Sequence, residues 1–135
     1  MYPLTHILAG LILVILLKLL SPLAPIQILI IFLSSVLIDV DHWLIYAFKK
    51  KNISISKAYF WFLSLQKSKK KPVFLYVFHT VEFFLLVALL SAKFQFFQLI
   101  LTGMAFHMVF DIISAIKDRE YLKQVSLIYC ILNRK

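Results

Sequence analysis

Ionisable side chains in this sequence gather inside segments that are otherwise apolar. Asp39, Asp41 and His42 lie within a long apolar run, and a charge placed there costs roughly 2.5 to 3.5 kcal/mol if the run spans a membrane. Similar positions are occupied by His6, His79, Glu82, His107 and Asp111. Imidazole and carboxylate groups without thiolate suit zinc, manganese or ferrous iron. We therefore expect these eight side chains to form a metal site.

The spacing of these residues supports a shared site. Three pairs combine a histidine with a carboxylate three or four residues away: Asp39 with His42, His79 with Glu82, and His107 with Asp111. Residues at this spacing share one face of a helix, so each helix can direct a pair into a bundle. Asp41 lies off that face. It is a ligand only if the helix bends there, and otherwise it orients a histidine.

The expected direct ligands are Asp39, His42, His107 and Asp111, with His6, Asp41, His79 and Glu82 completing or supporting the set. Zinc is the first expectation, with manganese and iron as alternatives, and the ligand count fits one or two ions. His6 has a simpler interpretation as a residue that faces lipid headgroups. Gly10 and Gly103 each lie four residues from a histidine, where a small residue allows close helix approach.

Composition indicates an all-α membrane protein of one domain, residues 1–135. Hydrophobic residues make up 62% of the chain and the mean hydropathy is +0.91, above the roughly 45 to 50% of a soluble domain. Two glycines and four prolines are too few for a turn-rich β fold. The single Cys130 excludes an internal disulfide. The net charge of +9 is attributed to topology and anionic lipids, and no nucleic-acid partner is expected.

The apolar runs predict a bundle of four transmembrane helices with short interfacial helices, the spans being residues 3–20, 26–48, 73–91 and 96–116. The lysine-rich connection, residues 49–71, carries a short amphipathic helix, and the tail is residues 117–135. The positive-inside rule places this connection and both termini in the cytoplasm of a prokaryotic cell with an inner membrane. All the candidate ligands then lie in the cytoplasmic half of the bilayer.

Three short motifs carry a resemblance to a known family: T-H-I-L-A-G from Thr5, L-I-D-V-D-H ending at His42, and G-M-A-F-H-M-V-F-D ending at Asp111. They resemble the LexA-regulated, inner-membrane-associated metal-dependent hydrolases, over most of the chain. The resemblance implies that His6, Asp39, Asp41, His42, His79, His107 and Asp111 are motif residues. Ile38 replaces the usual proline, and F-H-T-V-E supplies one histidine and Glu82 where many members have two histidines, which suggests a divergent branch.

The expected activity is metal-dependent hydrolysis of a phosphoester in a lipid or other amphiphile at the cytoplasmic face. A divalent ion lowers the pKa of bound water toward about 7 and polarises a phosphoryl group. Asp41 or Glu82 would serve as general base, and the lysine-rich connection would attract anionic headgroups. A metal or proton transporter and a b-type haem electron-transfer protein are the alternatives.

Overall fold

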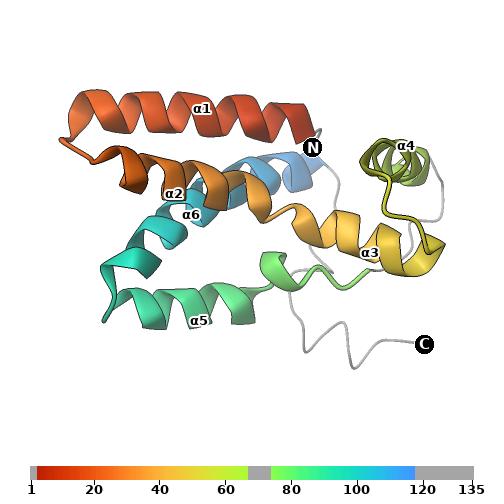
Figure 1. Cartoon of the computed structure of the whole chain (residues 1–135). Helices are drawn as coiled ribbons and strands as arrows, with labels where there is room; N and C mark the ends of the chain where they lie inside the picture. The colour runs from red at the N-terminus through yellow and green to blue at the C-terminus, as the bar shows by residue number, and fades with distance from the viewer. Residues whose placement is uncertain (1–2, 67–73, 118–135) are drawn as a thin grey trace.

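The computed structural model describes residues 3–66 and 74–117, and this part of the chain is helical, as predicted. The elements are α1 (Pro3–Leu20), α2 (Pro25–Leu37), α3 (Val40–Lys50), α4 (Ile55–Gln66), the 3-10 helix η1 (Val77–His79), α5 (Val81–Ser91) and α6 (Gln95–Lys117) (Figure 1). The second lysine cluster, residues 67–71, and the tail from residue 118 onward lie outside the described residues.

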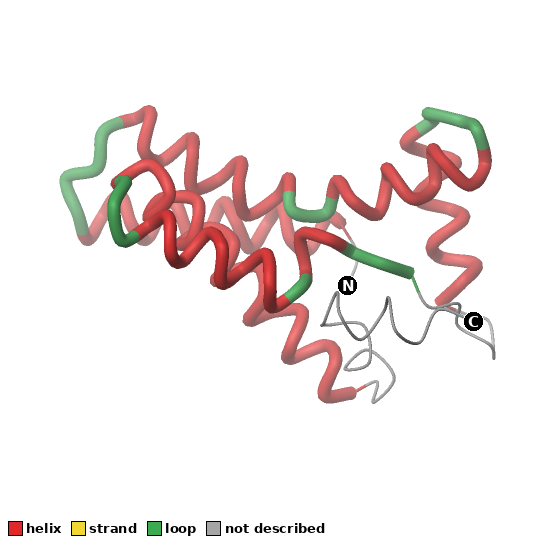
Figure 2. Tube along the Cα trace, turned by 90° about the horizontal axis from the view of Figure 1, so that it is seen from below, coloured by secondary structure: helices red, strands yellow, loops and turns green. Residues whose placement is uncertain are grey.

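Helix α2 lies at the centre of the packing. It contacts α6 most extensively and α1 next, while α5 packs along α6 and α1 also touches α6 (Figures 1 and 2). Both glycines lie at these contacts: a Cβ on Gly10 would lie 2.6 Å from Ser35 Oγ, and one on Gly103 would overlap Ser34 Oγ and the carbonyl of Ile31. The predicted role of the glycines in close helix approach is therefore seen at both contacts.

The second predicted span, residues 26–48, is not one continuous helix. It is divided into α2 and α3, which meet at an angle of 43° around Ile38 and Asp39. The N–H of Asp39 donates to Val36 O at 3.3 Å, three residues back, instead of continuing the α-helical pattern. The bend that would bring Asp41 into the site is thus present.

The third predicted span, residues 73–91, contains a shorter α-helix than expected. Phe74 to Tyr76 form no helix, η1 follows, and α5 begins only at Val81. Thr80 caps α5 by accepting from the N–H of Phe83 at 3.3 Å, which satisfies a donor that the helix start leaves unpaired. Residue 73 lies outside the described residues, and the part of this prediction that placed α-helix from residue 74 to residue 80 is wrong.

Within the described residues, one helix is long and apolar enough to cross a membrane, Gln95–Ile113. A second is obtained if Pro25–Leu37 and Val40–Lys50 count as one bent span. The apolar helices Thr5–Leu20 and Val81–Ser91 are shorter. At 1.5 Å per residue, the 11 residues of α5 extend about 16 Å, roughly half the thickness of a hydrocarbon core.

The predicted short helix in the lysine-rich connection is present as α4, which packs across α3. The ring centroids of Tyr46 and Trp61 are 5.6 Å apart, and the Trp43 indole N–H donates to Ile53 O at 3.0 Å. Ala58 is buried in this contact, whereas Phe60 is 67% exposed. Helix α4 therefore has a packed face and an exposed apolar face.

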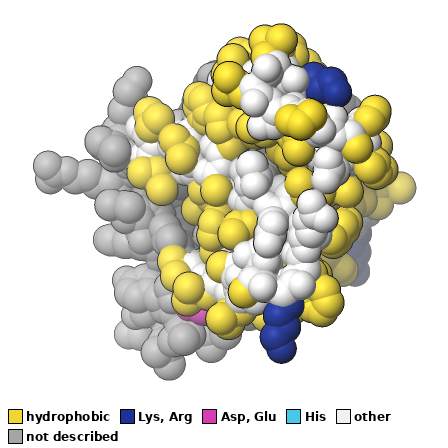
Figure 3. Space-filling model, turned by 90° about the vertical axis from the view of Figure 1, so that its left-hand side faces the viewer, with side chains coloured by type: hydrophobic (Ala, Val, Ile, Leu, Met, Phe, Trp, Pro, Cys, Tyr) yellow, Lys and Arg dark blue, Asp and Glu magenta, His cyan; other side chains and the backbone are white. Residues whose placement is uncertain are grey.

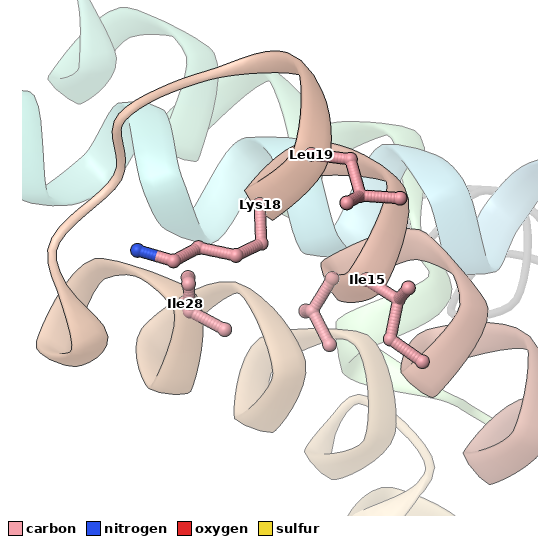
Figure 4. A pocket seen from close by; sticks show the side chains of 5 residues that line it. Ile15, Lys18, Leu19 and Ile28 are labelled. Carbon is pink, nitrogen blue, oxygen red and sulfur yellow. The ribbon is translucent and has the colours of Figure 1, made fainter.

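The end of the bundle formed by the α1–α2 and α5–α6 turns has a mostly hydrophobic surface with few charged side chains (Figure 3). Leu19, Leu20 and Leu89 are each more than 70% exposed near this end. A recess between α1 and α2 is lined by Val14, Ile15, Lys18, Leu19 and Ile28 (Figure 4). The Lys18 ammonium group donates to Leu23 O at 2.9 Å across the turn.

Candidate metal centre

Four parts of the fold meet at the opposite end of the bundle. They are the start of α1, the α2–α3 junction, η1 and the later turns of α6 (Figure 1). Together they bring seven of the eight predicted residues into one network of contacts: His6, Asp39, Asp41, His42, His79, His107 and Asp111. Three overlapping groups in this network could hold a metal ion: His6, His107 and Asp111; Asp39, His79 and His107; and Asp41, His42 and His79.

Four ligand atoms form the inner part of this network, which we call the inner set: Nε2 of His79, Nε2 of His107, Oδ1 of Asp39 and Oδ2 of Asp111. His79 Nε2 lies 3.5 Å from Asp39 Oδ1 and 3.4 Å from Asp111 Oδ2. His107 Nε2 lies 3.5 Å and 3.1 Å from the same two oxygens. Both Nε2 atoms are buried without a hydrogen-bond partner among the described residues.

Each of these four distances fits a pair of ligands bound to one ion. Two atoms bound to one ion at 2.0 to 2.2 Å lie about 2.8 to 3.6 Å apart when their bonds make an angle of 90° to 110°. The four contacts in the inner set span 3.1 to 3.5 Å. Two buried imidazole nitrogens without hydrogen bonds, facing two carboxylates at this separation, are a donor set that a divalent cation would satisfy.

The hydrogen bond made by Nδ1 of His107 shows which ring nitrogen carries the proton. Nδ1 lies 2.7 Å from the backbone carbonyl oxygen of Ser35, which can only accept. Nδ1 therefore carries the proton, and in a neutral ring Nε2 presents a lone pair to Asp39 and Asp111. A hydrogen bond of this kind to a backbone carbonyl is how metal-binding histidines are usually oriented.

His79 is oriented in the same way by Asp41. Its Nδ1 lies 3.0 Å from Asp41 Oδ2, which also accepts the backbone N–H of Phe78 at 3.2 Å. The other oxygen, Oδ1, accepts from His42 Nδ1 at 2.8 Å. Asp41 is buried at 4% exposure and both its oxygens are engaged, so it acts as the partner of two histidines.

His6 contacts the inner set through Asp111. Its Nε2 lies 3.3 Å from Asp111 Oδ1, whereas His79 and His107 contact Asp111 Oδ2. The His6 ring also stacks on His107 with centroids 3.9 Å apart. His6 is 4% exposed and thus packs inside the bundle, as a partner of Asp111.

His42 lies at the rim of the network, and its side chain is 32% exposed. Its ring stacks on Tyr76 at a centroid distance of 4.2 Å, and its Nδ1 is directed at Asp41, with Asp39 Oδ1 at 3.5 Å. His42, a predicted direct ligand, therefore lies farther from the inner set than His79, which was predicted only to complete or support the ligands. Asp39, His79 and His107 form one metal-capable group, and Asp111 joins His107 and His6 in another.

Glu82 is the one predicted residue outside the three metal-capable groups of the described residues. It lies in the first turn of α5. The prediction assumed one continuous helix through His79 and Glu82, but Thr80 is extended and separates η1 from α5. The shared-face rule for residues three apart therefore does not apply to this pair.

Two contributors were not anticipated from the sequence. The carbonyl of Ser35 is a backbone group, and no residue type marks it. Thr80 could have been recognised, because a threonine that precedes an apolar run with an acidic first turn marks a helix start. This threonine is 1% exposed and caps the N-terminus of α5.

Comparisons with protein-family models, curated proteins and solved structures found no match to this chain.

Proposed function

We propose that this chain is a membrane-embedded, metal-dependent hydrolase that binds one divalent ion through Asp39, His79, His107 and Asp111. The observation that supports this proposal most directly is the pair of buried Nε2 atoms of His79 and His107. They have no hydrogen bonds in the described part of the chain and lie 3.1 to 3.5 Å from two carboxylates. Two imidazoles and two carboxylates suit zinc, with manganese and iron as alternatives. The motif resemblance to the membrane-associated metal-dependent hydrolases agrees with this ligand set.

The exposed fractions of the ligand side chains support a catalytic metal site that is open to solvent over a purely structural one. His107 is enclosed, with 0% side-chain exposure, whereas the side chains of Asp39 and Asp111 are 25% and 26% exposed. Water or a substrate would thus approach from the carboxylate side. Four protein ligands complete the tetrahedral shell of a structural site, so catalysis here would need a fifth position for water, and the exposed carboxylate side is where that position would lie.

The bound ion would supply a water of lowered pKa and a positive charge beside the phosphoryl group. The protein's own part is to hold two imidazole lone pairs and two carboxylates toward one point. Of the two predicted general bases, Asp41 is engaged by His79 and His42. Glu82, the other predicted base, lies on the first turn of α5.

The proposed location is a prokaryotic inner membrane with four spans and with both termini in the cytoplasm. The apolar exposed surface of α1, α2, α5 and α6 supports lipid contact, and the lysines that end α3 support a cytoplasmic face for the metal end. On a background lacking Cys130, Lys93→Cys should react with an impermeant maleimide from outside, and Lys51→Cys should not. The reverse labelling would overturn the orientation.

The proposed substrate is an anionic amphiphile, and a phosphoester of a lipid is the first choice. Lys49, Lys50 and Lys51 follow the metal end along α3, with Lys49 Nζ 4.4 Å from the centre of the Phe74 ring. Such lysines attract anionic headgroups at a membrane surface.

The test is elemental analysis of detergent-purified protein, followed by assays on phosphoesters, carboxylic esters and amides. We expect about one divalent ion per chain and metal-dependent hydrolysis of amphiphilic phosphoesters. Glu82→Gln should retain the ion and lose activity. A folded, metal-loaded protein inactive on the whole panel would shift the assignment to a structural role or to transport.

The haem and transporter alternatives fit the geometry less well. The Asp39 and Asp111 carboxylates lie within 3.5 Å of the Nε2 atoms of His79 and His107, which leaves no room there for a porphyrin. A transport path would need polar groups toward the opposite end. Apart from Lys18, the α1–α2 recess found there is lined by apolar side chains (Figure 4).

A further inference from the structure

The interruption between α2 and α3 leaves one backbone carbonyl for use by another helix. In a continuous helix, the N–H of Asp39 would donate to Ser35 O, four residues back. Here it donates to Val36 O at 3.3 Å, and Ser35 O accepts from His107 Nδ1 at 2.7 Å. Ser35 and His107 are each 1% exposed and 72 residues apart in the chain.

We propose that this carbonyl is a positioning group that fixes the proton of His107 on Nδ1, and that Gly103 is the residue that lets α6 reach it. The consequence for metal binding rests on the function proposed above, whereas the position of the proton does not. An imidazole without such an acceptor favours the form protonated on Nε2. That form would point an N–H, instead of a lone pair, toward Asp39 and Asp111.

Gly103 lies one helical turn before His107, on the face of α6 that packs on α2. A Cβ there would overlap Ser34 Oγ and the carbonyl oxygen of Ile31, and would lie 2.9 Å from the backbone nitrogen of Ser35. Two of these three atoms belong to the backbone of α2, which cannot rotate away as a side chain can. Any side chain at residue 103 would therefore push α6 away from α2 and lengthen the contact between Ser35 O and His107 Nδ1.

Gly10 provides a matched control. It packs on the same helix, and a Cβ there would meet Ser35 Oγ at 2.6 Å and the Phe32 ring at 3.5 Å. Both partners are side-chain atoms, and the Ser35 hydroxyl can rotate at the loss of its 2.8 Å hydrogen bond to Phe32 O, without moving the Ser35 carbonyl. The change Gly10→Ala therefore tests close packing on α2 without moving His107 relative to the Ser35 carbonyl.

The direct measurement is nitrogen NMR of metal-free protein labelled with ¹⁵N-histidine in detergent micelles. With four histidines in the chain, the His107 signals can be assigned from their loss in His107→Asn. We expect a proton on Nδ1 of His107 in the wild type and in Gly10→Ala, with or without a second proton on Nε2, and a shift toward the form protonated on Nε2 alone in Gly103→Ala. A ring protonated on Nε2 alone in the wild type, or an unchanged ring in a folded Gly103→Ala protein, would overturn the proposal.

A second pair of variants covers the case in which Gly103→Ala does not fold. In His107→Asn, the side-chain amide can place an N–H near the position of Nδ1, whereas in His107→Gln it reaches the position of Nε2 instead. We expect the metal-free Asn variant to melt several degrees higher than the Gln variant, because it keeps a donor for Ser35 O. Equal melting temperatures, or a higher value for Gln, would contradict the positioning role.

Metal titration separates this proposal from the proposed function. Gly103→Ala should weaken binding of Zn²⁺ by about 10- to 100-fold, the usual effect of losing a hydrogen bond that orients a metal-binding histidine. Gly10→Ala should bind Zn²⁺ like the wild type. A wild type with the Nδ1–H ring but no affinity for Zn²⁺, Mn²⁺ or Fe²⁺ would defeat the metal centre and leave the positioning role intact.

Discussion

The two ends of the helical bundle differ in the regularity of their backbone. At the turn end, α1 leads into α2 and α5 into α6 through short connections, and the surface is mostly hydrophobic (Figure 3). At the metal end, α2 and α3 are bent apart by 43° and η1 precedes α5. The buried side chains of His6, Asp41 and His107 are found at this second end.

At the metal end, the irregular backbone supplies hydrogen-bond partners for the polar side chains. The break between α2 and α3 makes the Ser35 carbonyl available to His107, and the η1 segment presents the Phe78 N–H to Asp41. A buried polar group without a partner destabilises the fold by about 1 to 3 kcal/mol. Regular helices would satisfy their own backbone groups and offer none to these side chains.

The largest expected effect is the loss of the ion when an inner ligand is removed. His107→Ala or Asp39→Ala should reduce bound metal to background, because each removes one of four converging donors. Lys93→Ala, in the exposed turn at the other end, should retain it. Elemental analysis after gel filtration decides this, and unchanged metal content in either alanine variant would show that the site is misassigned.

The next largest effect concerns Asp41, the partner of His79. Asp41→Asn retains the size of the side chain but loses a negative charge and one acceptor, so His79 and His42 are held less firmly. We expect metal affinity to fall by about 10- to 100-fold, measured by competition with a fluorescent chelator. Gln27→Ala removes the 2.8 Å hydrogen bond from the Ala24 N–H at the turn end and should leave affinity within error.

A smaller effect is expected at the helix cap next to His79. The Thr80 hydroxyl donates to Val77 O at 2.8 Å and accepts from Phe83 N, so Thr80→Ala should lower stability by about 1 kcal/mol. Thr102→Ala is the matched control, because its hydroxyl is exposed and donates to Gln98 O within α6 at 2.8 Å. Equal melting temperatures for the two variants would argue against a special role for the cap.

The smallest effect is expected at the recess of the turn end. Lys18→Ala removes an exposed hydrogen bond to Leu23 O, and such surface changes usually alter stability by less than about 0.5 kcal/mol. Metal content and activity should be unchanged. If Lys18→Ala impaired metal binding, the two ends would be coupled and the contrast between them would not hold.

The sequence was sufficient to predict the all-α fold class and any histidine–carboxylate pair that lies on one uninterrupted helix. His107 and Asp111 are four residues apart on α6, and Nε2 of His107 lies 3.1 Å from the Asp111 carboxylate, as helical spacing requires. The continuous apolar runs and the shortage of glycine were enough to predict helices. These features depend on neighbours within a few residues.

The positions at which the helices are interrupted could be seen only in the tertiary structure. These interruptions in turn determine which histidine belongs to the inner set. Asp41 meets His79 and the Phe78 N–H across 38 and 37 residues, contacts that no local pattern encodes. They accompany the break before α3 and the late start of α5, which together turn His79 inward and leave His42 at the rim. Helix periodicity is a local property, whereas pairing of buried polar groups is satisfied between distant segments, so the ligand set emerges only when the chain has packed.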